Sequence, residues 1–124
     1  MLDGCKVGVL VEQGFEDAEL VETVRAMNDA GVLVIIIGSG SSRSYRGRRG
    51  KARNMVDTTA DGVSIDQLSA LIIPCGYAPD KMRLYQSMID LVKKSHGLNK
   101  VIAAICYGPQ LLISADIVRG RRVT

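Results

Sequence analysis

The sequence contains few of the residues from which metal centres and disulfide frameworks are built. Among 124 residues there is one histidine, His96, and there are three cysteines, Cys5, Cys75 and Cys106. A single imidazole excludes a metal site of the usual histidine-rich kind within this chain. Three cysteines without a C-x-x-C spacing argue against a disulfide framework and against a structural zinc site. We therefore expect neither a metal nor an organic cofactor.

Long hydrophobic runs are also missing. The apolar runs are too short to span a bilayer, and the opening residues MLDGCK lack the hydrophobic segment of a signal peptide. Hydrophobic residues make up 47% and charged residues 23% of the chain, which is typical of a globular domain. We expect one domain over residues 1–124 of a cytoplasmic protein, with no membrane partner.

Acidic residues are absent from one strongly basic segment. Six basic side chains lie between positions 43 and 53, namely Arg43, Arg46, Arg48, Arg49, Lys51 and Arg53. Without them 10 basic residues face 13 acidic ones, so the net charge of +3 becomes −3 and the basic character is local. Such a cluster can bind nucleic acid or phosphate, but only Tyr45 could stack on a base. We therefore favour a solvated loop or hairpin and do not expect a nucleic-acid partner.

Apolar runs that alternate with helical patterns predict a parallel α/β fold. Buried strands are expected at residues 6–11, 32–37, 70–73 and 101–105, and helices at 16–30, 80–95 and 110–115. The helix at 80–95 would place Met82 and Met88 near one buried face. Residues 43–59 are expected to form two short strands turning at 47–50, residues 63–68 a helical turn capped by Ser64, and residues 121–124 the start of a strand. The opening strand–helix–strand unit implies a right-handed crossover.

The stretch from Lys100 to Ala115, KVIAAICYGPQLLISA, predicts a nucleophile elbow. Its apolar run fits a strand buried on both faces of the sheet, Cys106 follows at the strand end, and Gly108 and Pro109 favour a tight turn into a helix. This layout would aim the thiol at backbone N–H groups, which lower the pKa of a thiol and donate to an oxyanion. The alternative is that Cys106 is a small buried hydrophobic residue.

The carboxyl ends of parallel strands form the usual ligand-binding edge of such a sheet. If the first, third and fourth strands are neighbours, Glu16, Gly76 and Cys106 would face one another there. Glu16 could then contact the sulfur, although its spacing alone favours a simpler role as negative charge in the first turn of a helix. Gly76 could offer a backbone N–H to a ligand, or it could be an ordinary turn glycine.

Three segments carry a resemblance to a known family: GFEDAEL at 14–20, LIIPCGYAPDKMRL at 71–84 and AAICYGPQLLISADIVRGRRVT at 103–124. They resemble the PfpI branch of the ThiJ/PfpI superfamily, which comprises intracellular cysteine proteases and related stress proteins. The resemblance runs from about Lys6 to the last residue. It implies a flavodoxin-like three-layer α/β/α sandwich with a mostly parallel sheet. It also implies that the C-terminal strands and closing helix of family members are missing from this chain.

The resemblance also implies roles for individual residues. Cys106 would be the nucleophile, Glu16 the carboxyl that contacts its sulfur, and the N–H groups of Gly76 and Tyr107 the oxyanion hole. Asp80 matches an acidic residue that completes the site of a neighbouring subunit, because members of this branch form dimers and hexamers. The implied substrates are a peptide or a small reactive carbonyl compound, such as a glyoxal adduct or methylglyoxal.

The sequence departs from the family pattern at the site itself. Tyr107 replaces the histidine that acts as general base, and a phenol with a pKa near 10 is a poor base at neutral pH. Cys75 replaces the first glycine of a Gly-Gly pair and would add a second thiol, and Tyr77 replaces an arginine. Together with these departures, the resemblance predicts a PfpI-like cysteine hydrolase that is weakened by the loss of its general base. The alternatives are a non-catalytic redox-sensing stress protein and an inactive scaffold.

Overall fold

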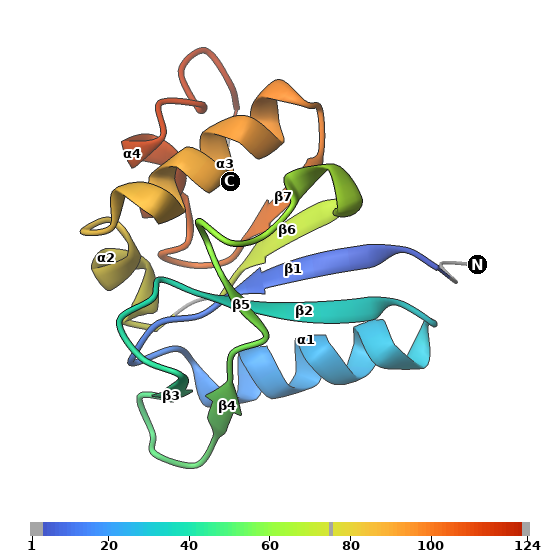
Figure 1. Ribbon diagram of the computed structural model, residues 1–124. Helices are drawn as coiled ribbons and strands as arrows, with labels where there is room; N and C mark the ends of the chain where they lie inside the picture. The colour runs from blue at the N-terminus through green and yellow to red at the C-terminus, as the bar shows by residue number, and fades with distance from the viewer. Residues whose placement is uncertain (1–3, 75, 123–124) are drawn as a thin grey trace.

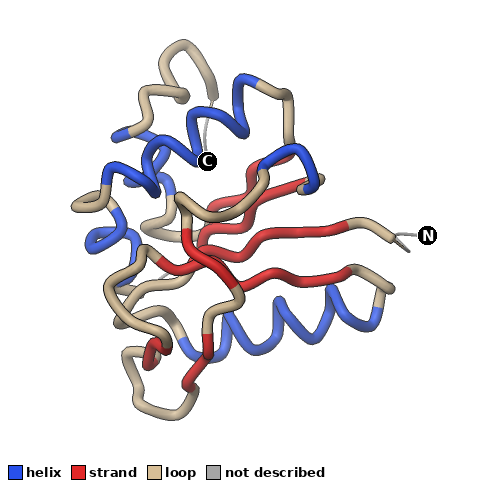
Figure 2. Tube along the Cα trace, in the orientation of Figure 1, coloured by secondary structure: helices blue, strands red, loops and turns tan. Residues whose placement is uncertain are grey.

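Five parallel strands form the central sheet, in the order β5–β2–β1–β6–β7 (Figures 1 and 2). The computed structural model describes residues 4–74 and 76–122, and all counts refer to that part of the chain. The strands are β1 (Lys6–Leu10), β2 (Leu33–Gly38), β5 (Thr58–Thr59), β6 (Ala70–Ile73) and β7 (Val101–Ala104). The predicted neighbours β1, β6 and β7 thus lie side by side.

Helices cover the sheet on both faces (Figure 1). Helix α1 (Asp17–Asp29) packs against β2 on one face, and α3 (Gln86–Gly97) packs against β6 and β7 on the other. The short helices α2 (Ala78–Met82) and α4 (Pro109–Ser114) contact each other, and η1 (Ile65–Gln67) is a 3₁₀ turn. This arrangement confirms the flavodoxin-like α/β fold.

The hydrophobic core lies between these layers. Its members come mostly from the central strands, including the fully buried Val9, Leu10, Ile37, Leu71 and Ile73. Each such side chain contributes about 1.5–3 kcal/mol through its removal from water. Apart from Lys6 at the start of β1, strands β1 and β6 carry no charged residue, as is typical of strands that helices cover on both faces.

A separate antiparallel hairpin of β3 (Ser44–Arg46) and β4 (Arg53–Met55) projects from the sheet (Figure 2). The two predicted short strands are therefore confirmed, with the turn between them at residues 47–52. Ser64 occupies the N-cap position of η1, but its side chain makes no capping hydrogen bond. None of the described helices is long and apolar enough to cross a membrane.

The predicted helix at 80–95 is wrong in its continuity, because it is broken into α2 and α3. Met82 and Met88 are both fully buried. In one continuous helix, side chains six residues apart point about 120° apart, so these two would lie at the edges of one apolar face. Between the two helices, Tyr85 is extended at φ −113° and ψ 113°, and Leu84 is 80% exposed.

The prediction that residues 101–105 are buried on both faces is also wrong. Strand β7 is the edge strand of the described sheet, and α3 covers only one of its faces. Ile102 and Ala104 pack toward the core, whereas Val101 is 67% exposed and Ile105 40% exposed. No strand forms at residues 121–122, and residues 123–124 lie outside the description.

Candidate active site

Cys106 lies on a tight turn at the carboxyl end of β7. The Ile105 N–H donates to the carbonyl of Ile73 at 3.3 Å, and the Gly108 N–H donates to the carbonyl of Ile105 at 2.8 Å. Cys106 itself is exposed and has a φ of +58°. This left-handed conformation is uncommon for a residue other than glycine and occurs often at functional sites. The interpretation of Cys106 as a buried hydrophobic residue is therefore wrong.

The structure reveals backbone donors near this edge of the sheet. Gly76 has a φ of +90° and forms an isolated antiparallel bridge with Phe15, in which the Tyr77 N–H donates to the carbonyl of Gly14 at 2.7 Å. Neither the Gly76 N–H nor the Tyr107 N–H donates to a carbonyl of residues 4–74 or 76–122. Their assignment to an oxyanion hole stays a prediction. The dipole of α4 adds little, because this helix has only six residues.

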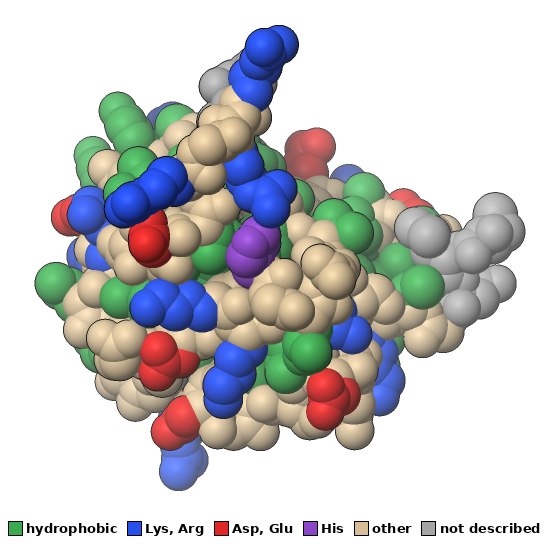
Figure 3. Space-filling model, turned by 90° about the horizontal axis from the view of Figure 1, so that it is seen from above, with side chains coloured by type: hydrophobic (Ala, Val, Ile, Leu, Met, Phe, Trp, Pro, Cys, Tyr) green, Lys and Arg blue, Asp and Glu red, His purple; other side chains and the backbone are tan. Residues whose placement is uncertain are grey.

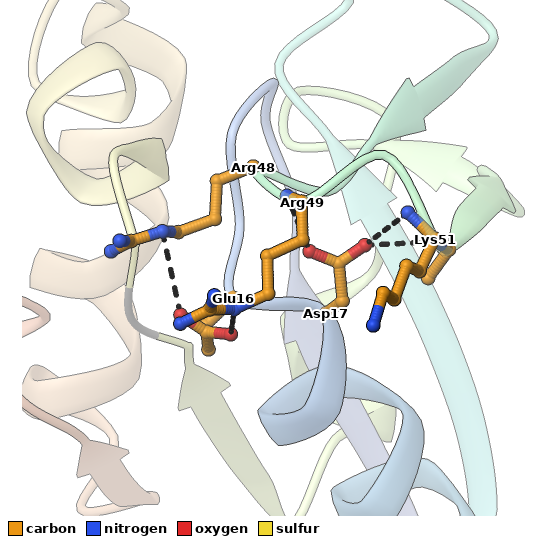
Figure 4. A network of polar contacts seen from close by, with 6 residues as sticks. Glu16, Asp17, Arg48, Arg49 and Lys51 are labelled. Carbon is orange, nitrogen blue, oxygen red and sulfur yellow. Dashed lines mark hydrogen bonds and ion pairs between the residues drawn. The ribbon is translucent and has the colours of Figure 1, made fainter.

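Glu16, at the N-cap position of α1, forms ion pairs with two arginines of the β3–β4 hairpin (Figure 4). Its Oε1 lies 2.9 Å from the Arg49 Nε, and its Oε2 lies 3.5 Å from the Arg48 Nε. The hydrogen bond to Glu16 raises the pKa of Arg49 above its usual value. The interpretation of the basic cluster as a solvated loop is therefore incomplete, since two of its arginines pair with Glu16.

The Asp17 carboxylate binds the backbone of the β3–β4 hairpin next to Glu16 (Figure 4). Its carboxylate accepts the backbone N–H groups of Arg49 at 2.8 Å, Lys51 at 2.9 Å and Ala52 at 2.8 Å. Burial raises the pKa of Asp17, but these N–H groups outweigh burial and the pKa lies below its usual value. The carboxylate also packs directly against Gly47, where a Cβ would overlap its atoms.

A second polar cluster joins the ends of β1 and β2. The buried carboxylate of Glu12 accepts the hydroxyl groups of Ser39 and Ser41, and Ser41 lies 2.9 Å from the buried hydroxyl of Tyr45. Tyr45 is fully buried, so it presents no ring to a nucleic-acid base. Our sequence analysis missed this cluster. Its signal was a glutamate and a serine-rich turn, GSGSS, following two neighbouring parallel strands.

Other candidate residues lie elsewhere. The Asp80 carboxylate is 3.9 Å from Arg83 and its side chain is 78% exposed, so its role in a neighbouring subunit stays a prediction. Cys75 lies outside the described residues. Among residues 4–74 and 76–122, no group of three or more histidine, cysteine, aspartate or glutamate side chains is close enough together to hold a metal ion.

His96 and Cys106 lie at opposite ends of β7. It lies in the last turn of α3, before β7 begins, whereas Cys106 follows the end of β7. His96 lines a hollow of about 450 Å³ together with Lys100, Arg121 and Arg122. Figure 3 shows the histidine, in purple, with lysine or arginine side chains nearby. Cys106 does not line this hollow, so His96 is not placed to serve the thiol as a base.

Comparison with known proteins matches nearly the whole chain to one family. The family model described as DJ-1/PfpI family matches residues 5–124. "Protein/nucleic acid deglycase 2" of Escherichia coli (strain K12) is 35% identical over 119 residues, which are 96% of this chain and 69% of that protein. "General stress protein 18" of Bacillus subtilis (strain 168) is 35% identical over 121 residues, which are 98% of this chain and 70% of that protein.

A solved structure has the same fold. It is a two-domain protein from Anabaena variabilis with DJ-1/ThiJ/PfpI-like and ferritin-like domains, and it superposes with a TM-score of 0.92 at 36% identity. The match covers 95% of this chain and 34% of that one, so this chain spans about a third of the two-domain protein. Sequence match and superposition lead to one conclusion: this chain belongs to the DJ-1/PfpI family.

Proposed function

We propose that the protein processes small reactive carbonyl compounds, such as glyoxal adducts or methylglyoxal, by covalent attack from Cys106. The observation that carries the proposal is an exposed thiol on a turn with a φ of +58°. Two backbone N–H groups without described backbone acceptors, those of Gly76 and Tyr107, belong to the same strand-end edge of the sheet. The relative from E. coli is named a deglycase, which supports the same class of substrate.

The first chemical step follows from these groups. The Cys106 thiolate attacks the carbonyl carbon, so an S–C bond forms while the π electron pair of the C=O bond moves to oxygen. The N–H groups of Gly76 and Tyr107 would donate to that oxygen as its negative charge develops. A proton from water then converts the oxyanion to the hydroxyl of a hemithioacetal.

An aldehyde suits this site better than a peptide. Addition to a free aldehyde such as methylglyoxal expels no leaving group, whereas hydrolysis of a peptide, like release of an amine from its glyoxal adduct, requires a proton donor for the departing amine. The family's histidine would supply that proton, but position 107 carries tyrosine and His96 lies at the other end of β7. Peptide hydrolysis therefore needs a group that these positions do not offer, and carbonyl addition does not.

The direct test measures consumption of methylglyoxal by the wild type and by Cys106→Ser. The variant should show the rate of the uncatalysed reaction, because a serine hydroxyl at this position has no histidine to activate it. Cys5→Ser is the matched control, since Cys5 is partly buried before β1 and should be dispensable. Equal rates for the wild type and Cys106→Ser would overturn the proposal.

Reversible oxidation of Cys106 is the second candidate function, and the exposure of this thiol favours it. In that reaction the thiolate attacks a peroxide oxygen, an S–O bond forms, the O–O bond breaks, and water leaves after protonation. Mass spectrometry after mild peroxide treatment should then find sulfenic acid at Cys106 before any change at Cys5. Oxidation of both thiols at one rate would exclude a sensor role.

A homo-oligomer, either a dimer or a hexamer, belongs to the same proposal. The exposed side chain of Asp80 is available to a neighbouring subunit. Light scattering should then report an oligomer, and Asp80→Asn should lower the rate of methylglyoxal consumption without changing the fold. A monomer with full activity would exclude a contribution from a second subunit.

A further inference from the structure

We propose that Arg48 binds an anionic group of the substrate, so that the site prefers carbonyl compounds carrying a carboxylate or a phosphate. This inference deepens the proposed function, on which it rests, by naming the class of carbonyl compound. It makes Arg48 a specificity-determining residue delivered by the hairpin to the same edge of the sheet as Cys106.

Arg48 pairs with Glu16 through Nε, so its terminal nitrogens are available as hydrogen-bond donors. Arg48 and Arg49 both approach the carboxylate through Nε. The two terminal nitrogens of Arg48 donate no hydrogen bond to a group of residues 4–74 or 76–122. Its side chain is 32% exposed, so these donors are accessible to a ligand. A guanidinium presents paired donors that match the two oxygens of a carboxylate or phosphate.

Contacts on two sides hold Arg48 toward the strand ends. Its backbone N–H donates to the carbonyl of Phe15 at 2.7 Å, and its Cζ lies 4.9 Å from the centre of the Tyr77 ring. Figure 4 shows the side chain reaching from the hairpin toward the chain between β6 and α2. Cation–π contact with Tyr77 fixes the guanidinium where a flexible side chain would otherwise swing into solvent.

The register of the sheet brings Cys106 to the same edge. Ile73 at the end of β6 pairs with Ala104 at the end of β7. Cys106 lies two residues beyond Ala104, and Gly76 lies three residues beyond Ile73. Gly76 is packed so closely against the chain at Phe15 and Glu16 that a Cβ would lie 2.6 Å from the Glu16 backbone nitrogen. Arg48, which pairs with Glu16, therefore lies at the edge of the sheet that carries Cys106.

The formal charges at this point balance. Two guanidinium groups face the carboxylates of Glu16 and Asp17, and the charge of Asp17 acts on Arg49 although its oxygens accept three backbone N–H groups of the hairpin. A preference for an anion therefore depends on the donors of Arg48 and not on an excess of positive charge.

The test compares alkylation of Cys106 by iodoacetate, an anion, with alkylation by neutral iodoacetamide. In both reactions the thiolate forms an S–C bond and iodide leaves, so the ratio of the two rates cancels the thiolate fraction and reports on the anion. The ratio for native wild type, followed by mass spectrometry, should exceed the ratio for the denatured chain. Arg48→Gln should lower the native ratio roughly threefold to tenfold, the effect of one nearby charge.

Two further variants separate the role of Arg48 from a general loss of charge. Arg46→Gln removes one positive charge from the same hairpin. Within residues 4–74 and 76–122 the ion-pair partners of Glu16 are Arg48 and Arg49, so the ratio should stay within about twofold. Arg48→Lys keeps the charge and should give an intermediate ratio. Thermal unfolding of each variant verifies that the hairpin change has not unfolded the domain.

Each outcome has one meaning. An unchanged ratio in Arg48→Gln, or equal losses in Arg48→Gln and Arg46→Gln, would overturn the inference. A selective loss would support it even if no aldehyde were turned over, because alkylation does not require turnover, and the proposed function would then fail alone.

If turnover is found, glyoxylate should outcompete methylglyoxal in the wild type and lose that advantage in Arg48→Gln. Inorganic phosphate should slow iodoacetate more than iodoacetamide at equal ionic strength if the site also accepts phosphate.

Discussion

The Oδ2 atom of Asp17 accepts the backbone N–H of Ala52 at 2.8 Å, which joins the first residue of α1 to a hairpin 35 residues later. The same carboxylate accepts two further N–H groups of that hairpin. Through this attachment Arg48 and Arg49 reach Glu16, the residue that precedes Asp17. Asp17 is therefore a positioning residue for the two arginines that pair with Glu16.

Asp17→Asn should lower the free energy of unfolding by about 2–3 kcal/mol. The amide keeps one oxygen as an acceptor but presents an NH₂ group to backbone N–H groups that also donate. Urea unfolding measures the change, with Asp66→Asn, an exposed position in η1, as the control expected to stay within about 0.5 kcal/mol. A loss as small as that of the control would contradict the anchoring role.

The stabilisation by Asp17 should depend on pH. Its pKa in the folded protein lies below the reference value of 3.8, so the ionised carboxylate stabilises the folded state above that pH. The contribution is lost as the pH falls through the folded pKa. The difference in unfolding free energy between the wild type and Asp17→Asn should be constant from about pH 7 to pH 5 and shrink below about pH 4. A difference that grew on acidification would contradict this assignment.

Gly76→Ala should disrupt the site and cost about 2 kcal/mol or more of stability. The residue has a φ of +90°, and a Cβ would overlap the carbonyl of Gly14. Alkylation of Cys106 and chemical unfolding would both be measured. The matched control is Gly97→Ala at the end of α3, where a Cβ meets no atom within 4 Å. Equal effects of the two changes would show that Gly76 has no special conformation in solution.

Tyr107→His should introduce the general base that the family pattern contains. An imidazole titrates near pH 6.5 and exchanges protons at neutral pH, whereas a phenol does so only near pH 10. Hydrolysis of a chromogenic peptide or ester should rise by roughly 10²-fold at pH 7.5. Tyr107→Phe should leave the wild-type rate unchanged, since the backbone N–H is retained. No gain in Tyr107→His would show that the turn does not orient a side chain at this position toward the thiol.

The pattern of apolar residues was sufficient to predict most of the fold. Strand β6 spans the predicted residues 70–73, and β1, α1 and β2 begin or end within one residue of expectation. Apolar runs and glycines act locally, so their consequences can be read without long-range contacts. The division of 80–95 into two helices escaped this reasoning, because no glycine or proline within these residues marks the break at Leu84 and Tyr85.

By itself, the sequence determined the parallel α/β class and the order strand, cysteine, turn, helix around Cys106, because both depend on residues close together in the chain. The tertiary structure alone decided that Arg48 and Arg49 form ion pairs with Glu16. Arg49 and Glu16 are 33 positions apart in the sequence. No local pattern selects one carboxylate for an arginine in a basic cluster. That choice depends on how the hairpin folds back over α1, which the buried carboxylate of Asp17 and the close approach at Gly47 determine.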